Sequence, residues 1–447
     1  MASDLLSIAS SGVKTARIAL DVTAQNIANV STEGYVRRSA AMQELVSVGG
    51  PDRLDVSLSG VRLERVVRNA DAFRQSEVRR TGADAARADA EVAGLTAIET
   101  AVEQSGAYAA TVDFEASLRQ LAADPVNTSL RAAVIEDARA MAQSLNMAAA
   151  ELDAAGTAMR FEAQAGVEQA NVLASELARV NLRLARAADG SSDRTSLLDQ
   201  RDLLLQKLSN HADVTTTIAA DQTVEVRLGG ASGPLMVSGG TSATLAMATA
   251  GDGMISFTLD GAAVSPTAGS LAGKAQALDK LAQARGDLDT IAADFITAMN
   301  TAQASGADLN GNAGQPLFSG TGAADIALAA SDGALIATAP AGSPAGSRDT
   351  GNLDTMRGAL ATADTADTAG RLDGLIFDIS STVAGRRITR DALAAIADTA
   401  SRALQAQAAV DLDHEAVNLV RFQQAFQASG RVMQVANDIF DTLLGIR

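Results

Sequence analysis

The chain has 447 residues, contains no cysteine or tryptophan, and carries a formal net charge of -17. Its length allows two to four domains, and the lack of cysteine excludes disulfides, thiolate metal sites and thiol nucleophiles. The acidic balance argues against nucleic acid as a partner, and the absence of a run of about 20 apolar residues argues against membrane insertion.

Small and apolar residues recur at three- and four-residue steps near the amino terminus. They predict a helix to about residue 30, with one face that needs a partner helix. Gly34 follows and supplies a permissive backbone that ends the helix. The residues on the predicted face are Leu5, Ile8, Gly12, Thr15, Ala19, Val22, Asn26 and Val30.

Alternation of apolar and polar residues, with glycine and proline between the runs, predicts a small β-hairpin region over residues 36–67. The Arg-rich stretch from Arg62 to Arg80 is interrupted by Glu64, Asp71 and Glu77. These carboxylates favour a solvated or interfacial helix face over a site for nucleic acid.

Helical periodicity dominates residues 69–210, with a break at Asp124-Pro125. Residues 211–270 are rich in threonine and valine, and glycines recur about every ten residues, which predicts a small all-β module. Helix returns over residues 271–301, a Gly/Asn loop follows at residues 306–314, and two further helical stretches cover residues 350–363 and 371–409.

A second stripe at three- and four-residue steps occupies the carboxyl end. We expect it to pair with the first stripe, so that residues 1–33 and 411–447 form a coiled-coil domain. The predicted fold is mainly α with inserted β: this terminal stem, an elongated helical domain over residues 34–210 and 271–410, and the β module at 211–270. The residues of the second stripe are Leu412, Leu419, Phe422, Phe426, Met433, Ala436, Phe440 and Leu443.

No residue set supports catalysis or a cofactor. The two histidines, His211 and His414, lack partners at ligand spacing, and no phosphate-binding loop or nucleophile elbow occurs. The segment beginning at Asp308 resembles the start of a calcium loop, but Ala313 replaces the glycine and Ser319 replaces the bidentate glutamate. We therefore expect a structural turn at Asp308, no cofactor and no enzymatic activity.

The residues Asn26-Ile27-Ala28-Asn29-Val30-Ser31-Thr32-Glu33-Gly34-Tyr35 resemble a signature of bacterial flagellar rod, hook and hook-associated proteins. Two asparagines on a helical seam favour a role in register and partner choice. We expect Asn26, Ile27, Asn29, Gly34 and Tyr35 to belong to the assembly interface, together with the apolar residues of the two stripes.

The rest of the chain resembles one branch of that superfamily, the hook-associated protein 1 family. Internal segments at residues 121–131, 197–209 and 307–318 carry the resemblance, and so does the terminal stretch at 415–444. His414 and Gly430 depart from the family pattern, and the glycine costs about 1 kcal/mol in a helix interior. The β module is short for this family, which suggests that an outer domain is missing.

The resemblance implies a structural subunit at the junction between hook and filament, which templates the filament through its terminal helices. Implied partners are copies of the chain, hook protein, and a second junction protein or filament protein. The resemblance also implies the flagellar export apparatus and a cytoplasmic chaperone that holds the carboxyl end. The amino terminus lacks a cleavable secretory signal, so we expect a cytoplasmic chain that is exported to the flagellum. We expect the termini to be loose in the free monomer.

Two other interpretations remain open. Another flagellar axial protein, such as a hook, rod or second junction protein, would share the terminal stem, but hook and rod proteins should be mostly β between residues 69 and 210. An Ala-rich signalling hairpin would need an uninterrupted heptad pattern, which the glycine-punctuated stretch at 212–268 disfavours.

Overall fold

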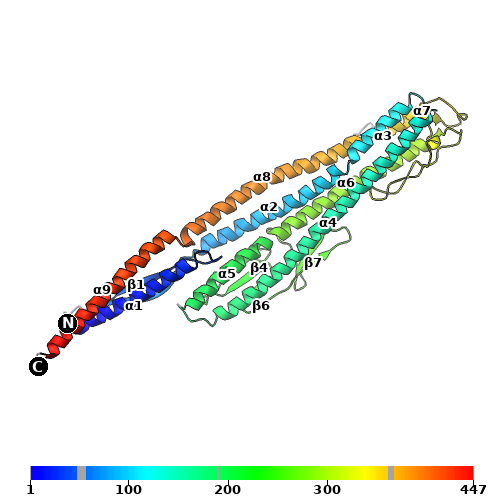
Figure 1. Cartoon of the computed structure of the whole chain (residues 1–447). Coiled ribbons are helices and arrows are strands. Elements are labelled where there is room, and N and C mark those ends of the chain that lie inside the picture. The colour runs from blue at the N-terminus through cyan, green and yellow to red at the C-terminus, as the bar shows by residue number, and fades with distance from the viewer. Residues whose placement is uncertain (1, 48–56, 190, 361–366, 446–447) are drawn as a thin grey trace. The chain divides into compact units, whose positions relative to one another are not determined.

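The computed structural model describes residues 2–47, 57–189, 191–360 and 367–445. Most of them lie in helices, and short antiparallel sheets are inserted between the helices (Figure 1). The mainly α fold with inserted β structure and paired terminal helices is therefore confirmed. The predicted turn at 49–51 and the predicted strand residues 54–56 lie outside the described residues. No described helix combines the length and hydropathy that crossing a bilayer requires.

The helices agree with the predicted periodicity to within a few residues at most ends. They are α1 (Ala2–Ala28), α2 (Ala72–Gln104), α3 (Ala107–Leu121), α4 (Thr128–Leu184), α5 (Ser192–His211), α6 (Ser270–Ala304), α7 (Gly351–Leu360), α8 (Thr368–Ala408) and α9 (Leu412–Gly445). The first helix ends two residues before the predicted limit, because residues 29–34 already form turns.

The strands are short, apart from one hairpin formed by β1 (Arg38–Ser47) and β2 (Ser57–Arg68). The others are β3 (Val214–Ile218), β4 (Val224–Leu228), β5 (Leu235–Ser238), β6 (Thr241–Ser242), β7 (Leu245–Thr249), β8 (Ile255–Leu259), β9 (Ala262–Val264), β10 (Gly306–Ala307), β11 (Phe318–Ser319), β12 (Ala327–Leu328) and β13 (Ala339–Pro340).

Side-chain caps define where two of the helices begin. The hydroxyl of Ser191 accepts a hydrogen bond from the Arg194 amide at 3.1 Å and starts α5. The carboxylate of Asp411 accepts from the Asp413 and His414 amides at 2.9 and 3.2 Å and starts α9. These amide hydrogen bonds favour the charged form, so they lower the pKa of Asp411.

The chain forms two compact units. The first unit contains Met1–Gly82, Asn171–Thr244 and Ala394–Arg447, and the second contains Ala83–Ala170 and Leu245–Leu393. Long helices such as α2, α4 and α8 contribute residues to both units. The division into stem, helical domain and β module stays a prediction, because compact units are groups of contacting residues and do not define which segments fold alone.

The strands predicted as one β module form two separate sheets. Strands β3 to β6 make a four-stranded antiparallel sheet that belongs to the first unit. Strands β7 to β9 make a three-stranded antiparallel sheet that belongs to the second. Glycine spacing predicts each turn, but it does not say which neighbouring strands pair, because pairing depends on contacts outside the turn.

The second unit has a large apolar core between α2, α3, α4, α6, α7 and α8. Phe114, Phe295 and Phe318 lie at its centre in edge-to-face contact, with ring centroids 4.9 to 6.0 Å apart. Beside them, the guanidinium of Arg131 is fully buried and donates to three backbone carbonyls and the Thr338 hydroxyl. These hydrogen bonds attach the loop before β13 to the start of α4.

Asp308, where the sequence resembles the start of a calcium loop, forms a turn. Its Oδ1 atom accepts from the amides of Asn310 and Asn312 at 2.9 and 2.8 Å. Within the described ranges, no group of three or more His, Asp or Glu side chains could hold a metal ion. The carboxylate therefore stabilises the backbone of its own loop.

Candidate assembly surface at the paired termini

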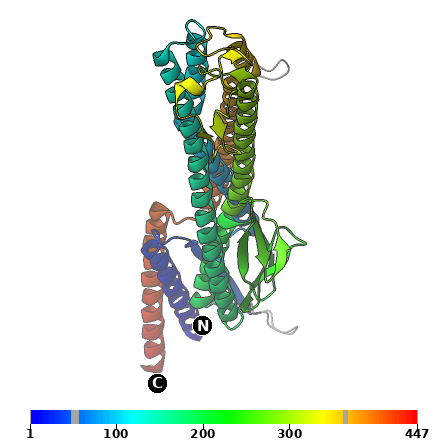
Figure 2. The same cartoon turned by 90° about the vertical axis from the view of Figure 1, so that its right-hand side faces the viewer.

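Helices α1 and α9 lie side by side and antiparallel, so that the two ends of the chain meet (Figures 1 and 2). At their closest approach, a Cβ added to Gly12 would lie 2.8 Å from the hydroxyl of Ser429. The absence of a side chain at Gly12 therefore lets the two helices approach closely here. We call α1, α9 and the hairpin β1–β2 the stem.

The seam between the two helices buries only some of the residues of the two predicted stripes. Thr15, Ala19 and Val22 of α1 are buried, and so is Ala436 of α9. Glu415, which is not a stripe residue, is buried as well. Ile8, Leu419, Phe422 and Met433 are half-buried. Small residues dominate this seam, so the helices pack through backbone proximity more than through bulky side chains.

Several of the predicted apolar contacts are exposed, and Phe426 is exposed although it lies one helical turn from Ser429. Leu5 is 41% exposed, Leu412 50%, Phe426 38% and Phe440 52%. A pair of helices covers only one side of each, so residues at the edge of the seam stay in contact with water. Leu443 lies within α9, but its side chain is outside the described part of the structure.

A second face of α1 contacts the hairpin. The amide of Val61 on β2 donates to the Ser11 hydroxyl at 3.2 Å, and the Thr15 hydroxyl donates to the carbonyl of Val61 at 3.3 Å. Gly60 precedes this contact with a φ of 101° and lies against Ile8 and Ser11. The hairpin therefore holds α1 from the side that α9 leaves open.

The signature residues fasten the turn after α1 to the hairpin. Asn26 is buried, and its amide group donates to the Arg38 carbonyl at 2.8 Å while its oxygen accepts from the Arg38 amide at 3.0 Å. The same oxygen accepts from the Tyr35 hydroxyl at 2.9 Å. Three of the four hydrogen-bonding positions of Asn26 are therefore used within this turn, and its role in register between helices stays a prediction.

The other signature residues also act locally. Asn29 donates to the Gln25 carbonyl at 2.8 Å, which caps the end of α1, and Ile27 is half-buried. Gly34 has a φ of 76°, and an added Cβ would lie 3.1 Å from Leu203 of α5. Burial raises the pKa of Tyr35, which lies with its ring 5.0 Å from the Arg38 guanidinium. A role of these five residues between copies of the chain stays a prediction.

A cluster of buried charges lies beneath this turn, and the sequence reasoning missed it. Arg68 bonds Asp199 at 2.6 Å and Asp202 at 2.7 Å, Arg38 bonds Asp199 at 3.2 Å, and Arg201 bonds Asp202 at 2.8 Å. The two aspartates come from α5, and Arg38 and Arg68 lie opposite each other at the open end of the hairpin. The signal in the sequence was a pair of acidic residues three apart, flanked by the leucines of α5.

The two aspartates respond differently to this environment. Burial is the largest influence on Asp199 and raises its pKa, although Arg68 and Arg38 oppose the shift. Burial also disfavours the charged form of Asp202, but Arg68 and Arg201 together outweigh it and lower its pKa. The carboxylate of Asp202 is therefore the one whose charge the cluster stabilises.

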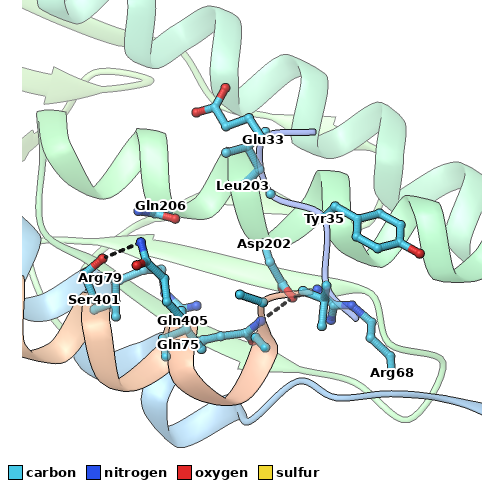
Figure 3. Close-up of a pocket in the computed structure, with 16 residues that line it drawn as sticks. Glu33, Tyr35, Arg68, Gln75, Arg79, Asp202, Leu203, Gln206, Ser401 and Gln405 are labelled. Carbon is cyan, nitrogen blue, oxygen red and sulfur yellow. Dashed lines mark hydrogen bonds and ion pairs between the residues drawn. The ribbon is translucent and has the colours of Figure 1, made fainter. Parts of the chain in front are cut away.

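A polar pocket of about 280 Å³ lies beside the cluster, within the first unit. Gln75 donates to Asp202 at 2.8 Å across its floor, and Gln405 donates to Ser401 at 3.5 Å. Figure 3 shows these side chains around the pocket together with Glu33, Tyr35, Arg68, Arg79, Leu203 and Gln206. The bond between Gln75 and Asp202 joins α2 to α5, whereas the bond between Gln405 and Ser401 lies within α8.

Arg37 joins the start of the chain to its end. Its amide donates to the Ala408 carbonyl at 2.8 Å, and its Nε atom bonds Glu415 at 2.6 Å across 378 residues of sequence. Because Glu415 is 1% exposed, this ion pair is shielded from water on one side. It fixes the loop between α8 and α9 next to the signature turn.

The two signature asparagines allow a matched test. Replacing buried Asn26 with alanine leaves the Arg38 amide and the Tyr35 hydroxyl without their acceptor, and should cost about 2 kcal/mol. Asn29→Ala removes bonds at the surface and should cost less than about 1 kcal/mol. Urea unfolding followed by circular dichroism measures both, and hydrogen exchange at residues 35–40 should rise only in N26A. Equal exchange in both variants would contradict the local role of Asn26.

The charge cluster allows a second test. Asp202→Asn leaves Arg201 buried without its carboxylate and Arg68 with Asp199 alone, and should destabilise the first unit by roughly 3 kcal/mol. The control Asp193→Asn alters an exposed pair with Arg183 and should change stability by less than about 1 kcal/mol.

The same two variants test how the stability of the fold depends on pH. Because the folded-state pKa of Asp202 is lowered, its stabilisation is present above a pH of about 4 and is lost as the pH falls. Thermal unfolding between pH 3 and pH 7 should therefore be less pH-dependent in D202N than in D193N. An unchanged pH dependence in D202N would contradict this assignment.

Comparison with known proteins is consistent with this architecture. Residues 95–318 match the model of the flagellar hook-associated protein FlgK helical domain. Residues 6–35 match that of the flagella basal body rod protein, and residues 400–446 match that of the flagellar basal body rod FlgEFG protein C-terminal region.

Relatives cover the whole chain. It is 25% identical over 556 aligned residues to flagellar hook-associated protein 1 of Escherichia coli strain K12, with all of both chains covered. It is 25% identical to the protein of that name from Bacillus subtilis strain 168, with 97% of each chain covered. The solved structure of the flagellar hook junction protein FlgK from Burkholderia pseudomallei aligns with a TM-score of 0.62 and 15% identity, covering 73% of this chain and 99% of that one. This chain belongs to the FlgK family of flagellar hook-associated proteins and is a structural protein of the bacterial flagellum.

Proposed function

We propose that this chain forms the junction between hook and filament, and that its paired terminal helices pack against those of neighbouring copies to line a central channel. The observation that carries the proposal is the antiparallel pairing of α1 with α9, which places both ends of the chain in one stem. For a filament subunit that is added next, the paired helices of this stem would act as the template.

A second face of α9 supports contacts between copies. Val417, Val420, Val432, Val435 and Ile439 are 40 to 68% exposed. Their spacing puts them on the side of α9 that faces away from the seam with α1, two near the start of the helix and three near its end. Exposed apolar residues grouped in this way are unfavourable in water, so we infer that neighbouring stems cover them in the assembled junction.

The partners follow from this position in the flagellum. One end of the junction would contact hook protein, and the other would contact a second junction protein or filament protein. Before export, a cytoplasmic chaperone would cover α9, since its apolar outer face and the exposed seam residues need shielding from water. We also propose that the chain passes through the flagellar export apparatus without a cleaved signal and then resides outside the cell.

The alternatives are less well supported. The helices α2 to α5 occupy the region in which a hook or rod protein should be mostly β. The hairpin β1–β2 and the two small sheets disfavour a continuous signalling hairpin. We infer no enzymatic activity, since the buried charges of the stem are engaged in fastening its elements.

Serine substitutions on the outer face of α9 test the proposal. Val417→Ser with Val435→Ser removes two side chains whose burial is worth about 1.5 kcal/mol each, and so should weaken each contact between stems by roughly a hundredfold. Cells that make only this variant should bear hooks without filaments, as should cells whose chain lacks residues 411–447. Electron microscopy of the flagella and an immunoblot for filament protein in the medium measure the effect.

The matched control is Gln423→Ser with Gln427→Ser, two exposed positions on the flank of α9. It should leave filament number unchanged. Circular dichroism of the purified variants separates lost assembly from lost folding, because V417S/V435S should keep the helicity of the parent chain. Normal filaments in cells that make V417S/V435S, or in cells that make the truncated chain, would contradict the proposal.

A further inference from the structure

The polar pocket of the first unit lies beside more positive than negative charge. Four arginines in or beside its wall are each at most 9% exposed, and only two largely buried aspartates accompany them. Buried charges are ordinarily paired, and arginine keeps its proton inside proteins. The result is a surplus of two positive charges. The six residues are Arg38, Arg68, Arg79, Arg201, Asp199 and Asp202.

Two other ion pairs near the pocket are balanced. Glu33 lines the pocket and bonds Lys207 at 3.0 Å. Arg37 bonds Glu415 at 2.6 Å beside the signature turn. Neither pair adds net charge, so the surplus is not offset by them. Because the whole chain has a formal net charge of -17, a pocket with a positive surplus is exceptional in it and attracts anions.

Arg79 on α2 is the arginine without a carboxylate partner. It lines the pocket, and its guanidinium has one hydrogen bond within the described residues, from Nη2 to the Thr216 hydroxyl at 3.3 Å. None of the ion pairs found in the described ranges involves it. Burial lowers the pKa of Arg79 more than nearby Asp202 raises it, as expected for a cation with little negative charge around it. Since a guanidinium carries five N–H groups, four remain to donate to a ligand.

Two further side chains on the pocket wall can donate to the same ligand. The Ser401 hydroxyl of α8 accepts from Gln405 at 3.5 Å and keeps its own proton for another acceptor. The side-chain amide of Gln206 on α5 forms no hydrogen bond within the part of the chain that the structure describes. Figure 3 shows Arg79, Ser401 and Gln206 around the pocket. Donors from three helices therefore surround one space.

These features define the chemistry of a ligand. Two surplus charges favour a dianion, since a monoanion such as chloride or acetate neutralises only one of them. Donors on several sides favour a ligand that accepts hydrogen bonds in several directions, as an anion with four oxygens does. Guanidinium groups bind phosphate oxygens through paired, charge-assisted hydrogen bonds. The pocket volume of about 280 Å³ is many times the roughly 15 Å³ that one water molecule needs, so such an anion fits with water around it.

We propose that this pocket binds a small tetrahedral dianion, free phosphate or sulfate, with Arg79 as its principal contact and Ser401 and Gln206 as further donors. Such an anion would neutralise the surplus charge and connect α2, α5 and α8 beside the signature turn. The site lies wholly within the first unit. It is independent of the proposed function, since nothing in it requires a second copy of the chain.

Calorimetric titration of the purified full-length chain tests the site. At constant ionic strength, phosphate and sulfate should each bind as one anion per chain, and acetate and chloride should bind roughly tenfold or more weakly. Arg79→Gln removes the charge-assisted hydrogen bonds and should weaken phosphate binding roughly tenfold or more. The control Arg17→Gln removes an exposed arginine of α1 and should leave the affinity for phosphate unchanged.

A substitution that adds negative charge gives a second test, which does not depend on the stability of R79Q. Gln405→Glu places a carboxylate on the pocket wall, so it should lower the affinity for phosphate roughly tenfold or more and raise the melting temperature of the phosphate-free chain. The control Gln427→Glu adds the same charge on the exposed flank of α9 and should do neither. Thermal unfolding followed by circular dichroism should show that phosphate stabilises the parent chain and Q427E, and stabilises Q405E less.

Several results would overturn the site. They are failure of the parent chain to bind phosphate and sulfate, parental affinity in a folded R79Q, and equal affinity for phosphate in Q405E and Q427E. Equal affinities of the parent chain for acetate and sulfate would overturn the assignment to a dianion. None of these measurements involves assembly, so their failure leaves the junction role standing, and failure of the junction role leaves the anion site standing.

Discussion

The structure depends on holding the two ends of a long chain against each other along one helical seam. An isolated helix of the length of α1 is marginal in water, so α1 and α9 each depend on burial against a neighbour. The seam supplies that burial through small residues, and the approach of Gly12 to Ser429 sets how close the two helices come. Arg37 then fixes the seam at its inner end, by its amide to Ala408 and its guanidinium to Glu415.

The signature turn is the joint between this seam and the rest of the first unit. Asn26 fastens the turn to the hairpin, and Gly34 lets the chain pass close to α5. Beneath it, Asp199 and Asp202 hold Arg38 and Arg68, which lie opposite each other at the open end of the hairpin. Removing one member of such a buried group leaves charge without a partner, so the joint is far more sensitive to substitution than the exposed ends of the stem.

The helices could be predicted from the sequence because their periodicity is local, and the pairing of α1 with α9 followed from two matching stripes. The hydrogen bonds of Asn26 could not be predicted, because its partners Tyr35 and Arg38 lie beyond the helix. An asparagine at this position would suit a polar position on the seam equally well. The charge cluster could not be predicted from the sequence for a related reason. Asp199 and Asp202 lie about 130 residues from Arg68, and a pattern within one helix does not name a partner so far away.

The central claim is that α1 and α9 pair within a single chain, and a disulfide across their closest approach tests it most directly. The Cβ of a residue at position 12 would lie 3.4 Å from the Ser429 Cβ, close to the separation that a disulfide requires. If the two helices pair within one chain, purified G12C/S429C should oxidise to a monomer with an internal disulfide that reductant reverses, whereas G12C and S429C alone should form no such bond. Failure to form this internal bond, or cross-linking only between chains, would contradict it.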